Sequence, residues 1–150
     1  MLLEVLQAFL GALIGTIGFA YLLHTPKRAI VPAGFIGALA YLLYWLLLEL
    51  GCIEVVSVFC GALFGALSAH FLAYRMKMIS TIYILLSIVA AVPGLGLYRF
   101  MSKLGTGEMA AAASVGTQAM ISILMIAMGI GLGGMLFRML HRLYQQLRRT

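Results

Sequence analysis

Five long runs of apolar residues dominate the sequence and limit its fold more than any other feature. They cover approximately residues 5–23, 30–50, 55–74, 79–101 and 110–137. Only 9% of the 150 residues are charged, whereas a soluble domain needs about 25% to cover its surface. About 20 helical residues cross a bilayer core of about 30 Å, and lipid offers the backbone no hydrogen-bond partners. The sequence therefore predicts an all-α, polytopic membrane protein, a single domain of five transmembrane helices.

Charged residues lie mostly between the apolar runs and predict the orientation of the chain. Outside the runs, one basic residue, Lys103, falls on one face of the membrane and eight fall on the other: Lys27, Arg28, Arg75, Lys77, Arg138, Arg142, Arg148 and Arg149. Because cytoplasmic segments carry the excess of Lys and Arg, we expect the N-terminus outside and the C-terminus in the cytoplasm, in a plasma or inner membrane. Residues 138–150 are expected to form a basic, cytoplasmic helical tail against anionic lipid headgroups.

The fourth run is interrupted by Pro93, Gly94 and Gly96. Proline removes a backbone donor and glycine lets the chain unwind, so this helix is predicted to be broken at Pro93–Gly96. If the helix restarts near Gly96, the positive end of its dipole points into the membrane and favours an anion. Arg99 follows within one turn. An arginine in a span is costly unless it pairs or snorkels, so Arg99 is either a functional residue or an interfacial anchor beside Tyr98.

Polar residues of the fifth run share one helical face, because Ser114, Thr117, Gln118 and Ser122 are spaced by three and four. They either line a path for a polar solute or hydrogen-bond neighbouring helices. His70, near the inner end of the third run, is either a proton carrier or an ordinary interfacial residue.

Glycines at helical spacing recur in the first and third runs. Gly11 and Gly15 match Gly61 and Gly65 at an offset of fifty residues, which makes the two runs candidates for a parallel internal repeat. Faces of this kind let helix backbones approach closely, and helix packing is the simpler explanation of these glycines.

Motifs for covalent or metal chemistry are missing from the sequence. It has no P-loop, HExxH or GxSxG motif, and no Cys/His cluster with metal-ligand spacing. Cys52 and Cys60 are expected to be packing residues. We therefore expect no enzymatic activity, no cofactor, no metal site and no nucleic-acid partner.

Three features together resemble the C-terminal membrane half of the threonine/serine exporter (ThrE) family. They are Ile17–Ala20 leading to Pro26–Ala29, the stretch Ala91–Arg99 with its PG-x-x-x-Y-R pattern, and the five-run hydropathy with short loops. The resemblance covers nearly the whole chain. It implies secondary export of small carboxyl-containing solutes, either threonine and serine or a dicarboxylate such as succinate. The residues carried over from the family pattern are Pro93, Gly94, Tyr98 and Arg99.

The resemblance also implies partners. The family's N-terminal half is absent from this chain, so we expect a separate partner subunit that carries it, a homo-oligomer, or both. In the resulting hypothesis the Pro93–Gly96 region and Arg99 receive the substrate carboxylate, while Ser114, Thr117 and Gln118 line the path. The alternative is a non-transporting structural subunit that scaffolds a partner holding the whole pathway.

Overall fold

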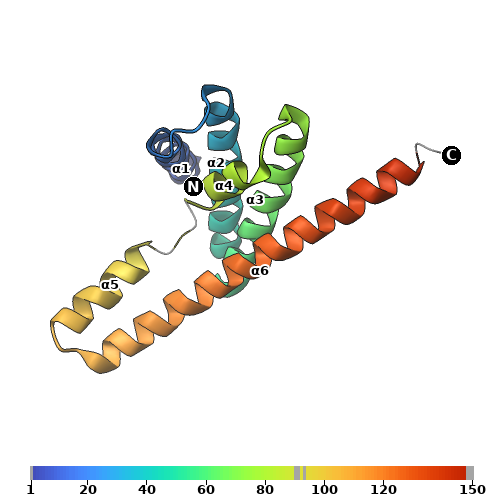
Figure 1. Cartoon of the computed structure of the whole chain (residues 1–150). Coiled ribbons are helices and arrows are strands. Elements are labelled where there is room, and N and C mark those ends of the chain that lie inside the picture. Colours follow the sequence, from blue (N-terminus) through green and yellow to red (C-terminus); the bar gives the residue numbers. More distant parts are fainter. Residues whose placement is uncertain (1, 90–91, 93, 148–150) are drawn as a thin grey trace.

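The computed structural model describes residues 2–89, 92 and 94–147, and these residues form helices joined by short connections (Figure 1). The helices are α1 (Leu2–Leu22), α2 (Lys27–Glu49), α3 (Glu54–Met76), α4 (Ser80–Ile88), α5 (Gly94–Gly105) and α6 (Met109–Leu147). The described residues contain no β-strand. The predicted all-α fold is therefore confirmed.

Four helices, α1, α2, α3 and α6, are long and apolar enough to cross a membrane. The predicted fifth span, 79–101, is instead divided between α4, with 9 residues, and α5, with 12. At 1.5 Å per residue these helices are about 14 Å and 18 Å long, so neither alone crosses a core of about 30 Å. The described residues thus contain four single-helix candidate spans rather than five.

The predicted break in this region is present, but it begins earlier in the chain than expected. α4 ends at Ile88, and α5 already begins at Gly94 rather than near Gly96. Pro93 lies outside the described residues. The residue before a proline is disfavoured in a helix, whereas glycine is tolerated in the first turn of a new one, so Gly94 and Gly96 belong to α5 and not to the break.

A tight turn joins α2 and α3 into an antiparallel pair. Gly51 adopts a φ of 83°, a left-handed conformation that favours glycine. This turn directs the Gly51 and Cys52 N–H groups back to the carbonyls of Leu48 and Leu47, each at 3.0 Å, and so closes the end of α2. The N-terminal end of α3 therefore lies beside the C-terminal end of α2.

Glycines of α3 and α6 make close contacts between helices. An ideal Cβ on Gly129 would lie 2.9 Å from the Cβ of Ala62, and one on Gly133 would lie 2.8 Å from the Cβ of Ala66. An ideal Cβ on Gly61 of α3 would likewise lie 3.1 Å from the carbonyl oxygen of Ala40 in α2. Because no hydrophobic effect operates between helices in lipid, this close backbone approach holds the helices together.

In α1 the matching glycines behave differently. No described atom lies within 4 Å of an ideal Cβ on Gly11, Gly15 or Gly18, so these glycines make no close helix contact with the described part of this chain. Instead α2 supplies the glycines of the α1–α2 contact: a Cβ on Gly37 would lie 2.7 Å from the hydroxyl oxygen of Thr16. The sequence match between the first and third runs is thus not accompanied by equal packing.

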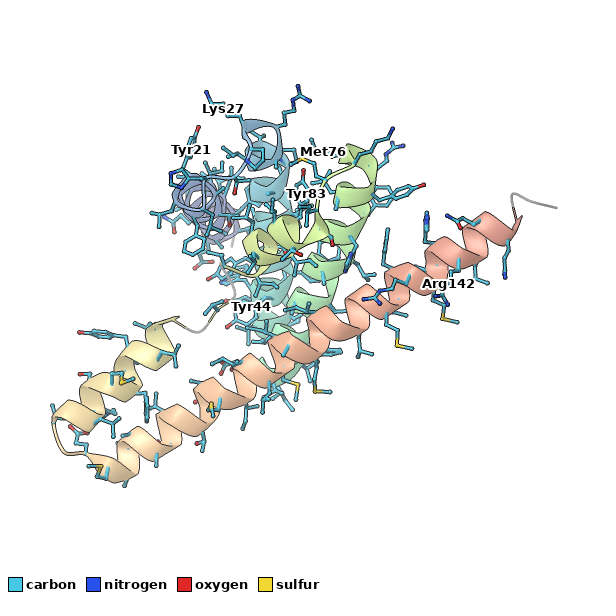
Figure 2. All side chains as sticks on the ribbon, in the orientation of Figure 1. Tyr21, Lys27, Tyr44, Met76, Tyr83 and Arg142 are labelled. Carbon is cyan, nitrogen blue, oxygen red and sulfur yellow. The ribbon has the colours of Figure 1, made fainter. Side chains whose placement is uncertain are left out.

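The short helix α4 lies at the centre of the bundle. Tyr83 and Leu86 are fully buried, and the Tyr83 hydroxyl donates to the Sδ atom of Met76 at 3.0 Å, next to which it lies in Figure 2. Most other fully buried residues are small alanines, while many large apolar side chains point outward. This inverted distribution suits a protein whose solvent is lipid.

The longest helix, α6, has 39 residues and measures about 58 Å, which exceeds the thickness of a bilayer core. It crosses α3 obliquely, and its N-terminal part packs against α5 through Gly116 and Phe100 (Figure 1). Its helix continues through the predicted tail as far as Leu147, without a boundary at residues 137–138.

Candidate functional site

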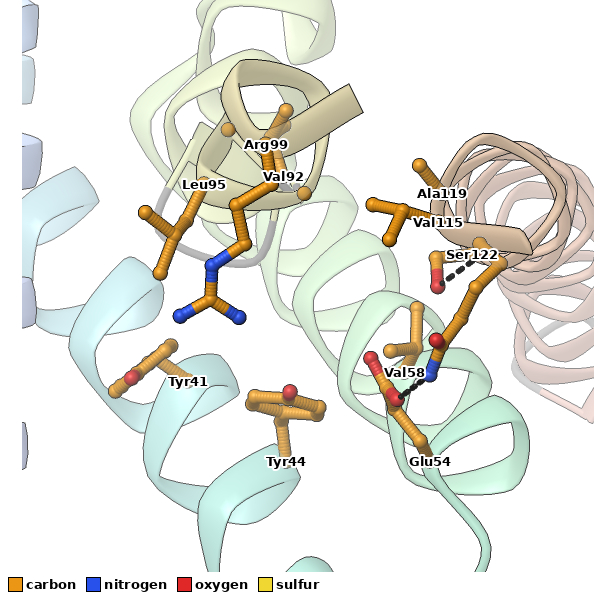
Figure 3. Close-up of a pocket in the computed structure, with 13 residues that line it drawn as sticks. Tyr41, Tyr44, Glu54, Val58, Val92, Leu95, Arg99, Val115, Ala119 and Ser122 are labelled. Atoms are coloured by element: carbon orange, nitrogen blue, oxygen red, sulfur yellow. Dashed lines mark hydrogen bonds between the residues drawn. The ribbon is translucent and has the colours of Figure 1, made fainter. Parts of the chain in front are cut away.

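A cavity of about 480 Å³ lies where α5 and α6 meet α2 and α3 (Figure 3). Residues from four helices and from the α4–α5 connection line it: Tyr41, Tyr44, Glu54, Val58, Val92, Gly94, Leu95, Gly96, Arg99, Val115, Gln118, Ala119 and Ser122. Much of the lining is apolar, and a few polar and charged groups converge on it. This combination is typical of small-molecule sites.

Arg99 brings a positive charge into the cavity. Its side chain leaves α5 and extends toward Tyr41 and Tyr44 of α2 (Figure 3). Among the described residues, no carboxylate oxygen lies within 4 Å of its guanidinium group. The guanidinium carries five donors in a fixed fork that matches a carboxylate, and here that fork is free to take an anion from outside the chain.

Glu54 brings a negative charge to the other side of the same cavity. It occupies the first turn of α3, where the helix dipole stabilises a carboxylate. The Nε2 atom of Gln118 donates to its Oε2 atom at 2.7 Å and so ties α6 to the start of α3. Ser122 is buried one turn further along α6, and its hydroxyl donates to the carbonyl of Gln118 at 3.1 Å.

Of the residues singled out from the sequence, the structure brings Gly94, Gly96, Arg99 and Gln118 together around this cavity. Tyr98 does not line it, and its side chain is 70% exposed. Pro93 lies outside the described residues.

Ser114 and Thr117 also lie away from the cavity lining. Their hydroxyls donate to carbonyls of α6 itself, that of Ser114 to Ala111 at 2.9 Å and that of Thr117 to Ala113 at 2.8 Å. The polar stripe of the fifth run is therefore divided: Gln118 and Ser122 face the cavity, while the two hydroxyl residues before them are bonded within their own helix.

Three polar lining residues, Tyr41, Tyr44 and Glu54, are not among the residues singled out from the sequence. The two tyrosines are three residues apart on α2, and their rings lie 5.7 Å apart. A pair of hydroxyl-bearing rings at helical spacing in an apolar run was the available signal for them. Glu54 lies between two apolar runs, where a charged residue is ordinary, so the sequence does not mark it as a site residue.

His70 lies far from this cavity. It is sixteen residues beyond Glu54 on the same helix, or about 24 Å along the axis. It stacks on Phe137 of α6 with ring centroids 5.3 Å apart and lines a second cavity, of about 580 Å³, with Arg75 and Lys77. Its role in proton coupling stays a prediction.

No three His, Cys, Asp or Glu side chains gather closely enough to hold a metal ion in the part of the chain that the structure describes. The cavity instead presents one cation, one carboxylate, one amide, one aliphatic hydroxyl and two phenol groups. Groups of this kind bind and orient polar solutes.

Comparison with protein-family models matches residues 8–136 to the threonine/serine exporter, ThrE. No curated protein and no solved structure matches the chain. The matched region contains every residue that lines the cavity and most of the apolar helices. This match confirms the resemblance seen in the sequence, and the chain belongs to the threonine/serine exporter (ThrE) family of membrane transporters.

Proposed function

We propose that this chain is a component of a secondary exporter of small carboxyl-containing solutes, and that the cavity between α2, α3, α5 and α6 binds them. The solute is threonine or serine, or a dicarboxylate such as succinate. The observation that carries the proposal is the free guanidinium of Arg99 in that cavity, with no carboxylate within 4 Å among the described residues. Arg99 is exposed in this chain, so its guanidinium group is accessible to a solute, and a cation within the membrane is worth its cost when it binds an anion.

The start of α5 supports the same substrate class. α5 begins at Gly94, which lines the cavity together with Gly96. The amino end of a helix carries a partial positive charge, so it attracts the same carboxylate as Arg99 does. Gln118 extends the polar wall on the side of α6.

We propose further that α4 and α5 together make the fifth crossing, since their combined length is about that of a bilayer core. The N-terminus is then outside and the C-terminus in the cytoplasm of a plasma or inner membrane. Support comes from Lys27 and Arg28 at the start of α2 and from Arg75 and Lys77 at the end of α3, two helix ends that lie together (Figure 1). In this orientation the cavity lies toward the outer face.

A partner subunit, a second copy of the chain, or both are expected to complete the transporter. Transport requires that a site be exposed alternately to the two sides, and such sites usually lie between two repeats or bundles. The glycines of α1 support this expectation, because they leave room for another helix at Gly11, Gly15 and Gly18.

Replacement of Arg99 tests the proposal. In proteoliposomes, the Arg99→Gln variant should transport threonine and succinate about 10-fold to 100-fold more slowly, because a lost hydrogen bond to a charged group costs about 1.5–3 kcal/mol. Arg99→Lys should retain part of the rate, since it keeps the charge but loses the fork geometry. Arg142→Gln is the matched control, because Arg142 is exposed on α6 and lies outside the cavity.

Wild-type transport by Arg99→Gln would contradict the proposal. Photo-crosslinking with a labelled solute separates it from the alternative of a structural subunit. Labels on α5 and α6 support a direct role in the pathway, whereas labels confined to a partner protein would favour scaffolding.

A further inference from the structure

Glu54 is the second charged group of the cavity, and the carboxylate-binding hypothesis does not use it. It projects from α3 on the side of the cavity opposite to Arg99 (Figure 3). One of its oxygens, Oε2, accepts the hydrogen bond from Gln118 at 2.7 Å. Its other oxygen, Oε1, accepts no hydrogen bond from any described residue, and no basic side chain among them lies within 4 Å.

The hydrogen bond from Gln118 fixes the position of this carboxylate without neutralising it. A carboxylate has about four lone-pair sites, and the single amide donor occupies one of them. The remaining sites face a cavity that is large enough for a small solute. Charge-assisted hydrogen bonds are about twice as strong as neutral ones, so an ammonium group is the preferred occupant.

The cavity therefore presents two opposite charges, each without a counter-ion from the described protein. A zwitterion satisfies both at once, with its carboxylate at Arg99 and its ammonium group at Glu54. A dicarboxylate satisfies Arg99 but brings its second negative charge against Glu54, and like charges brought together in this way disfavour binding.

We infer that Glu54 receives the ammonium group of the solute and so makes this cavity select zwitterionic amino acids over dicarboxylates. The inference rests on the proposed function, because it assumes that Arg99 takes the carboxylate. Glu54 acts as a specificity-determining residue, and Gln118 acts through it as a positioning residue.

Binding selectivity tests the inference in the full-length chain, purified and placed in lipid nanodiscs. Three ligands are compared: L-threonine; 2,3-dihydroxybutyrate, in which a hydroxyl replaces the amino group; and succinate. The wild type should bind threonine most tightly. Glu54→Gln should weaken threonine binding about 10-fold or more, which matches the loss of one hydrogen bond to a charged group. The same variant should leave the affinity for the dihydroxy acid nearly unchanged and should strengthen succinate binding.

Glu54→Gln keeps an oxygen that accepts the hydrogen bond from Gln118, so the local structure is preserved. Two further variants make the test specific. Glu49→Gln is the matched control, because Glu49 is exposed at the end of α2 and lies outside the cavity. Arg99→Gln should weaken binding of all three ligands.

The possible failures are distinguishable. Suppose that Arg99→Gln weakens the binding of all three ligands but Glu54→Gln changes the three affinities by the same factor. Glu54 then does not bind the ammonium group and the inference is wrong, while the proposed function stands. If the wild type binds succinate as tightly as threonine, the inference is also overturned. If the wild type binds none of the three ligands, both the inference and the proposed function fail.

Discussion

Gly129 makes a close contact between α3 and α6, and its replacement by alanine tests how the fold is held together. An ideal Cβ at this position would lie 2.9 Å from the Cβ of Ala62 and 3.0 Å from both the backbone N of Leu63 and the carbonyl O of Phe59. Two of these three atoms belong to the backbone of α3, so they cannot swing aside as a flexible side chain does. The added methyl group must push the two helices apart.

The size of the effect follows from two opposing contributions. Alanine is favoured over glycine inside a helix by up to about 1 kcal/mol. Overpacking a close contact costs about 1–3 kcal/mol, and separating the helices also loses dispersion contacts along their length. We therefore expect Gly129→Ala to lower the free energy of unfolding by up to about 2 kcal/mol after the helix gain is subtracted.

Gly131 provides the matched control on the same helix. No atom of the described residues lies within 4 Å of its ideal Cβ, so Gly131→Ala adds the same methyl group without a collision with them. This variant should keep the helix gain and be as stable as the wild type, or more stable by up to about 1 kcal/mol.

Reversible unfolding in mixed micelles, followed by circular dichroism, measures both variants. The same samples report on the cavity, because α6 carries Gln118 to Glu54 and a shift of α6 lengthens their 2.7 Å hydrogen bond. Solute binding should therefore weaken in Gly129→Ala and not in Gly131→Ala. Equal stability of the two variants would refute the argument that the Gly129 contact holds α3 and α6 together.

Two further substitutions examine polar groups in the bundle. Thr16 is fully buried, and its hydroxyl has no hydrogen-bond partner among the described residues. A buried hydroxyl without a partner costs about 1–3 kcal/mol, so Thr16→Val should leave the melting temperature unchanged or raise it. A clear fall in the melting temperature would show that the hydroxyl is bonded. His70→Phe should fold normally, because a phenyl ring can keep the stack on Phe137. If His70 carries protons, this variant should lose the dependence of export on a pH gradient in proteoliposomes, and gradient-driven export at the wild-type rate would contradict that role.

Local physics made several features of the site predictable from the sequence. An intramembrane arginine is expensive wherever it occurs, and proline with glycine interrupts a helix in any context, so Arg99 and the break before it could be identified without a structure. Gln118 followed from helical spacing alone. The exact start of the helix after the break could not be predicted in this way, because α5 begins at Gly94 rather than near Gly96.

The other members of the site depend on contacts between distant segments. Glu54 and Gln118 are sixty-four residues apart, and they meet only because α6 crosses α3 at its glycines. Tyr41 and Tyr44 reach the same cavity because the Gly51 turn lays α2 beside α3. No local signal specifies such meetings, so the sequence alone does not place Glu54, Tyr41 and Tyr44 in one site.

The sequence by itself determined that this protein is helical and lies in a membrane. Lipid allows only helices or closed barrels to satisfy their backbone hydrogen bonds, and the long continuous apolar runs fit helices rather than the short alternating strands of a barrel. Only the tertiary structure decided which glycines pack. Gly11 and Gly61 stand in the same sequence pattern, yet an ideal Cβ on Gly61 would lie 3.1 Å from the carbonyl oxygen of Ala40, whereas no described atom lies within 4 Å of one on Gly11. The difference arises because a glycine only permits close approach, while the path of a neighbouring helix determines whether that approach takes place.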